Sequence, residues 1–132
     1  MYKKAPGASI PRGTDRCFAA ALSHLGAMEL IDTHAHIDLP RFGDAAARLA
    51  AAGRAQAAGI VGIVVPGVEP ATWDAMLATA ALLRAAVPGV GIHTAIGIHP
   101  QVLPDLEPGR DGDHCDALAT RVLAAPPGMV AI

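Results

Sequence analysis

The sequence is poor in aromatic residues, which make up 3% of 132 residues, and it contains only two cysteines. Cys17 and Cys115 lie far apart without a CxxC pair, which excludes a disulfide framework and favours free thiols in a reducing, cytoplasmic compartment. The formal net charge is −2, and no basic run stands out beyond Lys3 and Lys4. This charge pattern excludes the electrostatic footprint of a duplex-DNA-binding protein. No apolar run approaches the ~20 residues that cross a membrane, so no membrane partner is expected.

Alternating strand and helix patterns begin at Met28, in a chain rich in Ala, Gly, Val, Leu and Ile. The predicted strands span 28–36, 60–67, 90–100 and 128–132, and the predicted helices span 43–59, 69–89 and 113–125. The strands are apolar on both faces, which is typical of parallel strands covered by helices. The sequence therefore predicts an α/β fold, either an open doubly wound sheet or part of a (β/α)₈ barrel. No GxGxxG follows the first strand, which disfavours a dinucleotide-binding sheet.

Helical spacing predicts a buried face on the second helix, formed by Trp73, Met76, Leu77, Ala80 and Leu83. Pro70 fits the first turn of that helix, where its missing N–H has no partner to lose. Asp44 is predicted near the start of the first helix and Gly59 at its end. Asp113 is predicted to cap the third helix.

Residues 1–27 are predicted to form an N-terminal extension, partly disordered, with one helix over 14–25. Ser23 and His24 interrupt its apolar run, so the segment is a poor secretion signal. Met28 is an alternative start of the chain. The predicted domain then spans 28–132.

Polar residues interrupt the apolar stretch "LIDTHAHIDLP", Leu30–Pro40. Because residues i and i+2 of a strand share a face, Asp32, His34 and His36 are predicted on one side, with Ile31 turned toward the helices. Two imidazoles near the carboxyl end of a strand can chelate one divalent ion, and Asp32 can orient a ligand. The alternative is a pair of hydrogen-bonded histidines without a metal.

The third strand carries a histidine at its end. His99 is predicted at the same rim as His34 and His36, since parallel strands place their carboxyl ends together. Pro100 follows and terminates the strand. The alternative for His99 is a loop-end histidine held in place by Pro100.

Three segments together resemble the TatD-like metal-dependent hydrolases of the amidohydrolase superfamily: "MELIDTHAHID" with Phe42–Asp44, "IVVPGVEPATW", and "AIGIHPQ". The resemblance runs from about Met28 to Ile132. It implies a (β/α)₈ barrel with one or two divalent metal ions, Zn, Mg or Mn, that hydrolyses phosphodiester bonds; several relatives are deoxyribonucleases. By matched position, His34 and His36 are expected as metal ligands, and His99 is expected either to contact the substrate phosphate or to lie just outside the metal shell.

The sequence departs from the family pattern in its second half. The family's Gly-Glu motif follows the fourth strand, and further His and Asp ligands follow it, so the resemblance covers only the N-terminal half of a barrel. We therefore expect an incomplete hydrolase for small or single-stranded nucleic acid, inactive alone, with possible self-association through open sheet edges. Two alternatives remain: another amidohydrolase acting on C–N or ester bonds, and a catalytically inactive fragment with a structural role.

Overall fold

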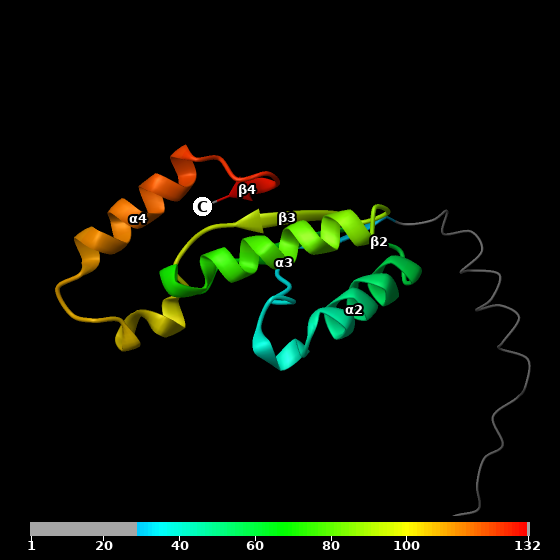
Figure 1. Cartoon of the computed structure of the whole chain (residues 1–132), viewed down its shortest axis with the longest axis horizontal. Coiled ribbons are helices and arrows are strands. Elements are labelled where there is room, and N and C mark those ends of the chain that lie inside the picture. Colours follow the sequence, from blue (N-terminus) through cyan, green and yellow to red (C-terminus); the bar gives the residue numbers. More distant parts are fainter. Residues whose placement is uncertain (1–28, 132) are drawn as a thin grey trace, which may run out of the picture.

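The structure, a computed structural model, describes residues 29–131. The predictions for the extension, its helix and Cys17 lie outside these residues. Four strands form one parallel sheet in the order β1-β2-β3-β4 (Figure 1). They are β1 (Leu30–Asp32), β2 (Ile60–Pro66), β3 (Gly91–Ala95) and β4 (Met129–Ala131).

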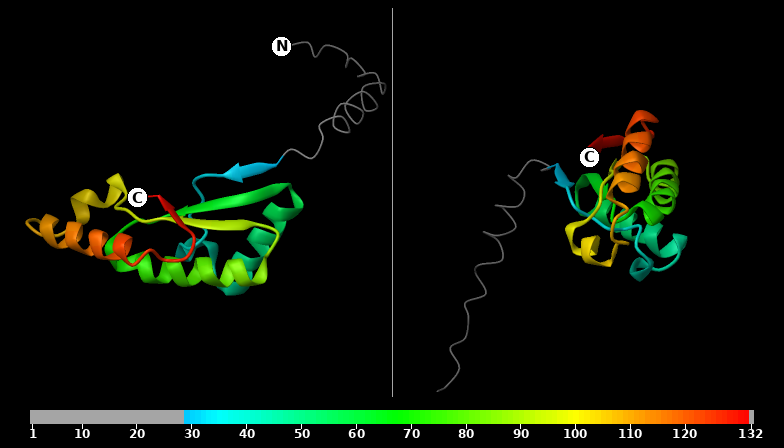
Figure 2. Two further views of the ribbon diagram at one scale, coloured as in Figure 1. Left: turned by 90° about the horizontal axis from the view of Figure 1, so that it is seen from above. Right: turned by 90° about the vertical axis from the view of Figure 1, so that its left-hand side faces the viewer.

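Helices alternate with the strands and lie on one side of the sheet (Figure 2). The α-helices are α2 (Ala45–Ala57), α3 (Trp73–Ala86) and α4 (Asp111–Leu123), and the short 3-10 helices are η1 (Pro40–Phe42), η2 (Pro70–Thr72) and η3 (Pro100–Asp105). A doubly wound sheet carries helices on both faces, whereas successive βα units of a (β/α)₈ barrel carry them on one. The α/β prediction is confirmed, and the arrangement is consistent with part of a barrel. No helix in residues 29–131 has both the length and the apolar character that a membrane crossing requires.

The core lies between the sheet and the helices. Trp73, Met76, Ala80 and Leu83 of α3 are buried as predicted, and Leu77 is partly buried. They meet the helix-facing side chains of the sheet, which include Ile63, Val65 and Ile92, and Ile96 directly after β3. Each of these aliphatic side chains contributes roughly 1.5–3 kcal/mol on burial, so this layer fixes the strands that carry the candidate site.

The helix ends follow local chemistry. The Asp44 carboxylate accepts a hydrogen bond from the Ala47 N–H at 2.9 Å and caps α2. Gly59 follows α2 with φ of +91°, a conformation that glycine adopts without strain. The capping prediction for Asp113 is wrong, because α4 begins at Asp111. Asp113 instead lies in the first turn of α4 and forms an ion pair with Arg110 at 2.8 Å.

The first strand differs most from its prediction. Of the described part of the predicted strand, residues 29–36, only Leu30–Asp32 is a strand, and all three of its residues are exposed. Ile31 is 62% exposed and aligns with Gly62, whereas Asp32 aligns with the core residue Ile63. Since aligned residues share a face, Ile31 lies on the face away from the helices, opposite to the prediction. A register shift between Leu30 and Ile31 accounts for the changed alternation.

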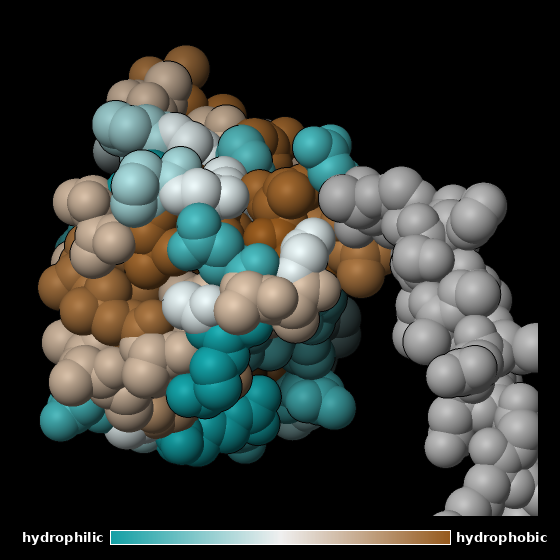
Figure 3. All heavy atoms as spheres, turned by 90° about the vertical axis from the view of Figure 1, so that its right-hand side faces the viewer, coloured by the Kyte–Doolittle hydropathy of each residue, from teal (hydrophilic) through white to brown (hydrophobic). Residues whose placement is uncertain are grey.

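The edges of the described sheet carry exposed apolar side chains. Besides Ile31 in β1, Val130 in β4 is 58% exposed. Figure 3 views the end where the chain enters β1 and shows apolar surface beside polar surface. Self-association through these edges stays a prediction.

Candidate metal centre

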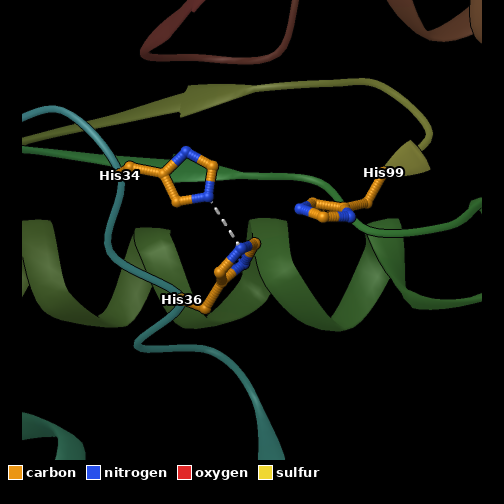
Figure 4. Close-up of side chains that lie close together, drawn as sticks. All are labelled: His34, His36 and His99. Carbon is orange, nitrogen blue, oxygen red and sulfur yellow. Dashed lines mark hydrogen bonds between the residues drawn. The ribbon is translucent and has the colours of Figure 1, made fainter. Parts of the chain in front are cut away.

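Three histidines converge at the carboxyl ends of β1 and β3. His34 and His36 come from the segment after β1, and His99 comes from the segment after β3 (Figure 4). The Nε2 atoms of His34 and His36 are 3.1 Å apart. One ligand atom of each of the three rings lies within 4.8 Å of the others, so the cluster can hold a metal ion. The expected closeness of His99 to the pair is therefore present, while the three roles stay predictions.

Backbone hydrogen bonds bring the first two rings into place. The ladder of β1 ends at Asp32, but the Ala35 N–H still donates to the Val64 carbonyl at 3.0 Å. Between these points, the Asp32 carboxylate accepts a hydrogen bond from the backbone N–H of His34 at 3.1 Å. Asp32 thus fixes the backbone at His34, and it forms no hydrogen bond with either imidazole ring. The expectation that Asp32 orients a metal ligand stays a prediction, and its described contact is with the His34 backbone.

His99 is held at both its backbone and its ring. Its N–H donates to the Val68 carbonyl at 2.7 Å, which fixes the segment after β3 to the segment after β2. Its ring Nδ1 accepts a hydrogen bond from the Gln101 N–H at 3.2 Å. A neutral imidazole that accepts at Nδ1 carries its proton on Nε2. The other ring nitrogen of neutral His99, Nε2, is therefore a hydrogen-bond donor. A donor suits a contact to a phosphate oxygen better than a bond to a metal.

The electrostatic surroundings of His36 favour its neutral form. Burial lowers the pKa of His36, and the positive charge that His34 can carry lowers it further. Neutral imidazole is the form that binds metals. Burial raises the pKa of the neighbouring Asp38. Within the described residues, neither His36 Nδ1 nor Asp38 Oδ1 has a hydrogen-bond partner, although both atoms are buried.

The separation of the two Nε2 atoms fits a shared ion. Two nitrogens bound tetrahedrally at 2.0–2.1 Å from a zinc ion lie about 3.3 Å apart. The observed 3.1 Å is close to that value and is also a hydrogen-bond distance. The positions of His34 and His36 therefore fit two ligand positions of a metal centre, and the same atoms are within hydrogen-bonding distance of each other.

Two hollows flank His99. One, of about 230 Å³, is lined by the ends of β2 and β3 and includes Gly67 and Gly97. The Trp73 indole N–H donates to the Gly97 carbonyl at 2.9 Å, which ties the buried start of α3 to the wall of this hollow. The prediction that Trp73 belongs to the core is confirmed, since its side chain is 1% exposed.

The second hollow is lined in part by residues that no sequence pattern indicates as functional. It measures about 130 Å³ and is lined by His36, Leu39, Arg41, Val68, His99, Gln101 and Val102. Arg41 stands five residues after His36 in the chain, so a cation close to the histidines was visible in the sequence. Its position depends on the turn η1, whose course the sequence pattern did not predict.

The parallel sheet and the histidine cluster at its carboxyl edge define an α/β protein with a candidate metal centre. Such a site at that end of the strands is where (β/α)₈ enzymes carry their chemistry. The chain belongs to the TatD related DNase family, whose pattern matches residues 31–132. This family consists of metal-dependent hydrolases with a TIM-barrel fold. No curated protein and no solved structure matches the chain.

Proposed function

We propose that the histidine cluster is part of a metal-dependent phosphodiesterase site that acts on single-stranded or small nucleic-acid substrates. The observation that carries the proposal is the 3.1 Å separation of the His34 and His36 Nε2 atoms at the carboxyl edge of the sheet. Membership of the TatD related DNase family supports the same reaction class. His34 and His36 would hold the ion, whether zinc, magnesium or manganese. A bound divalent ion supplies positive charge that polarises a phosphate and acidifies water.

The chain's own residues contribute binding and orientation. His99 donates from Nε2 toward a phosphate oxygen, because the Gln101 N–H occupies its Nδ1. Asp32 anchors the backbone of His34 and so limits the movement of the first ligand. Partial burial lowers the pKa of His36 and so favours the neutral ring, which is the form that binds metal. In these contacts, none of the three side chains gives a proton to the reacting atoms or takes one from them. We therefore assign no catalytic acid or base.

The described residues supply only part of a catalytic metal shell. A catalytic zinc typically takes three protein ligands and an open position. Within residues 29–131, the grouped ligand atoms are those of the three histidines, without a carboxylate. If His99 serves the substrate, two ligands remain. We therefore expect the 132-residue chain alone to hold metal weakly and to hydrolyse phosphodiesters little above background.

Metal binding and turnover together test this function. The chain is titrated with Zn²⁺, Mn²⁺ and Mg²⁺, and it is incubated with a phosphodiester, a carboxylic ester and a cyclic amide. We expect saturable metal binding that His34→Ala weakens by at least about tenfold. We expect any turnover to need metal and to be confined to the phosphodiester. Turnover of the amide or the ester instead would support the alternative amidohydrolase function. Absence of metal binding by the unmodified chain would support the structural role.

A further inference from the structure

The charge of Arg41 acts on Asp38 and His36 only from a distance, without a hydrogen bond or ion pair within the described residues. Residues 29–131 contain six arginines, and four of them have partners: Arg48 donates to Thr79, Arg84 to the Ile92 carbonyl, Arg110 to Asp113, and Arg121 pairs with Asp74. Arg41 and Arg54 form no hydrogen bond or ion pair with the other described residues. Arg54 lies in α2, whereas Arg41 lies in η1, the turn that follows the two histidines.

The 130 Å³ hollow described above, here called the Arg41 hollow, adjoins the candidate metal centre. Two of the three clustered rings, His36 and His99, form part of its wall. Arg41 enters from η1 and Gln101 from η3, and the remaining lining residues are aliphatic. The lining residues therefore include an arginine, a glutamine and a histidine whose Nε2–H is free to donate, and no Asp or Glu of the described residues lines the hollow. This composition suits an anion and not a cation.

We propose that the Arg41 hollow binds a phosphate group of the substrate, next to the phosphate that reaches the histidine cluster. The proposal rests on the proposed function and identifies its substrate class as one that carries two neighbouring phosphates. The planar guanidinium of Arg41 presents two parallel N–H groups to phosphate oxygens, which gives orientation as well as affinity. His99 borders both spaces and donates to either phosphate.

This arrangement predicts a preference between substrates. A dinucleotide with a 5′-phosphate offers one phosphate to the cluster and one to the Arg41 hollow, whereas the same dinucleotide without it leaves the hollow empty. The site therefore discriminates by phosphate number, independently of the bases. A longer single strand satisfies both positions with adjacent backbone phosphates.

Calorimetric titration of the full 132-residue chain tests the proposal without metal or turnover. The probes, in buffer with a chelator, are thymidylyl-thymidine, its 5′-phosphorylated form, and inorganic phosphate. We expect the phosphorylated dinucleotide to bind about five- to tenfold more tightly than the unphosphorylated one, as a charge-assisted contact at a partly exposed site allows. Arg41→Gln should reduce this ratio to within about twofold, and Arg41→Lys, which keeps the charge but not the fork, should give an intermediate ratio.

Arg54→Gln is the matched control, since it removes the same charge from an exposed position on α2. It should preserve the full ratio. Equal ratios in Arg41→Gln and the unmodified chain would overturn the proposal, and so would an equal loss in Arg54→Gln. Arg41-dependent binding of inorganic phosphate without any preference between the dinucleotides would assign the hollow to a free phosphate and overturn the two-phosphate substrate. Because the measurement needs no metal, a failure of metal binding or hydrolysis would refute the proposed function separately.

Discussion

The Nε2 atoms of His34 and His36 lie 3.1 Å apart although the two residues do not belong to a regular strand. The rings meet nearly at right angles, with an interplanar angle of 85° and centroids 4.8 Å apart. Both nitrogens therefore point into one small space. The two Nε2 atoms are within hydrogen-bonding distance across that space. We propose that a divalent ion takes the place of this hydrogen bond when metal binds.

Removal of either ring should cost metal affinity. His34→Ala and His36→Ala each delete one of two close ligands, so we expect zinc affinity to fall by at least about tenfold. Competition with a chromogenic chelator measures the change. His114→Ala, in α4, is the control and should keep the affinity within about twofold, because His114 is not part of the cluster. An equal loss in all three variants would mean that zinc binds without using the cluster.

The Asp32 contact predicts a smaller effect of a different kind. Asp32→Ala removes the acceptor for the His34 backbone N–H, an exposed hydrogen bond worth roughly 0.5–1.5 kcal/mol. We expect zinc affinity to fall by about two- to tenfold, and Asp32→Asn, which keeps an oxygen acceptor, to restore part of it. Parallel chelator titrations compare the variants. Unchanged affinity in Asp32→Ala would show that Asp32 does not position His34.

The Asp44 cap should affect stability without affecting the site. Asp44→Ala removes the side-chain acceptor for the Ala47 N–H at the start of α2. The free energy of unfolding should fall by about 1 kcal/mol, the usual cost of losing an N-cap. Urea denaturation measures this, and zinc affinity should stay the same. A loss of zinc affinity would indicate that α2 supports the cluster directly.

Trp73 should couple the core to the loop that carries His99. Trp73→Phe keeps an aromatic ring but leaves the Gly97 carbonyl without its indole donor, so we expect roughly 1–3 kcal/mol lower stability. The His99 ring should also exchange between positions on the microsecond-to-millisecond timescale, visible as a broadened imidazole resonance in NMR spectra. Leu82→Ala, which changes an exposed residue of α3, is the control. A sharp His99 resonance in Trp73→Phe would contradict this coupling.

Long periodic segments were predictable from the sequence because their burial is repeated along the chain. The buried face of α3 from Trp73 to Leu83 follows the helical period, and the uninterrupted apolar run of β2 indicates a strand covered by helices. The order of these elements then restricts the fold to a parallel sheet with helices on one face, as in a barrel, or on both faces, as in a doubly wound sheet. The structure decides between them by placing the helices on one side.

Irregular backbone limited the rest of the prediction. The face of Ile31 depends on a register shift that no period of two can reveal. Asp113 follows a plausible capping pattern, but α4 begins two residues earlier, and Asp113 pairs with Arg110 instead. The place of Arg41 depends on the path of η1. The closeness of the two histidines was predictable, because side chains two positions apart can meet in many backbone conformations. The position of Arg41 could be known only once the backbone path of η1 was known.

Zinc binding by His34 and His36 can be seen directly in a crystal of the chain that is soaked in zinc and measured at the zinc absorption edge. If both histidines bind zinc, an anomalous peak is expected about 2.0–2.1 Å from the Nε2 atoms of His34 and His36. His99 is expected to keep its Nδ1 contact with the Gln101 N–H and to lie outside the direct metal shell. In saturating zinc, the cluster could instead lack zinc, with His34 and His36 still hydrogen-bonded to each other. That result would contradict metal binding by the histidine pair.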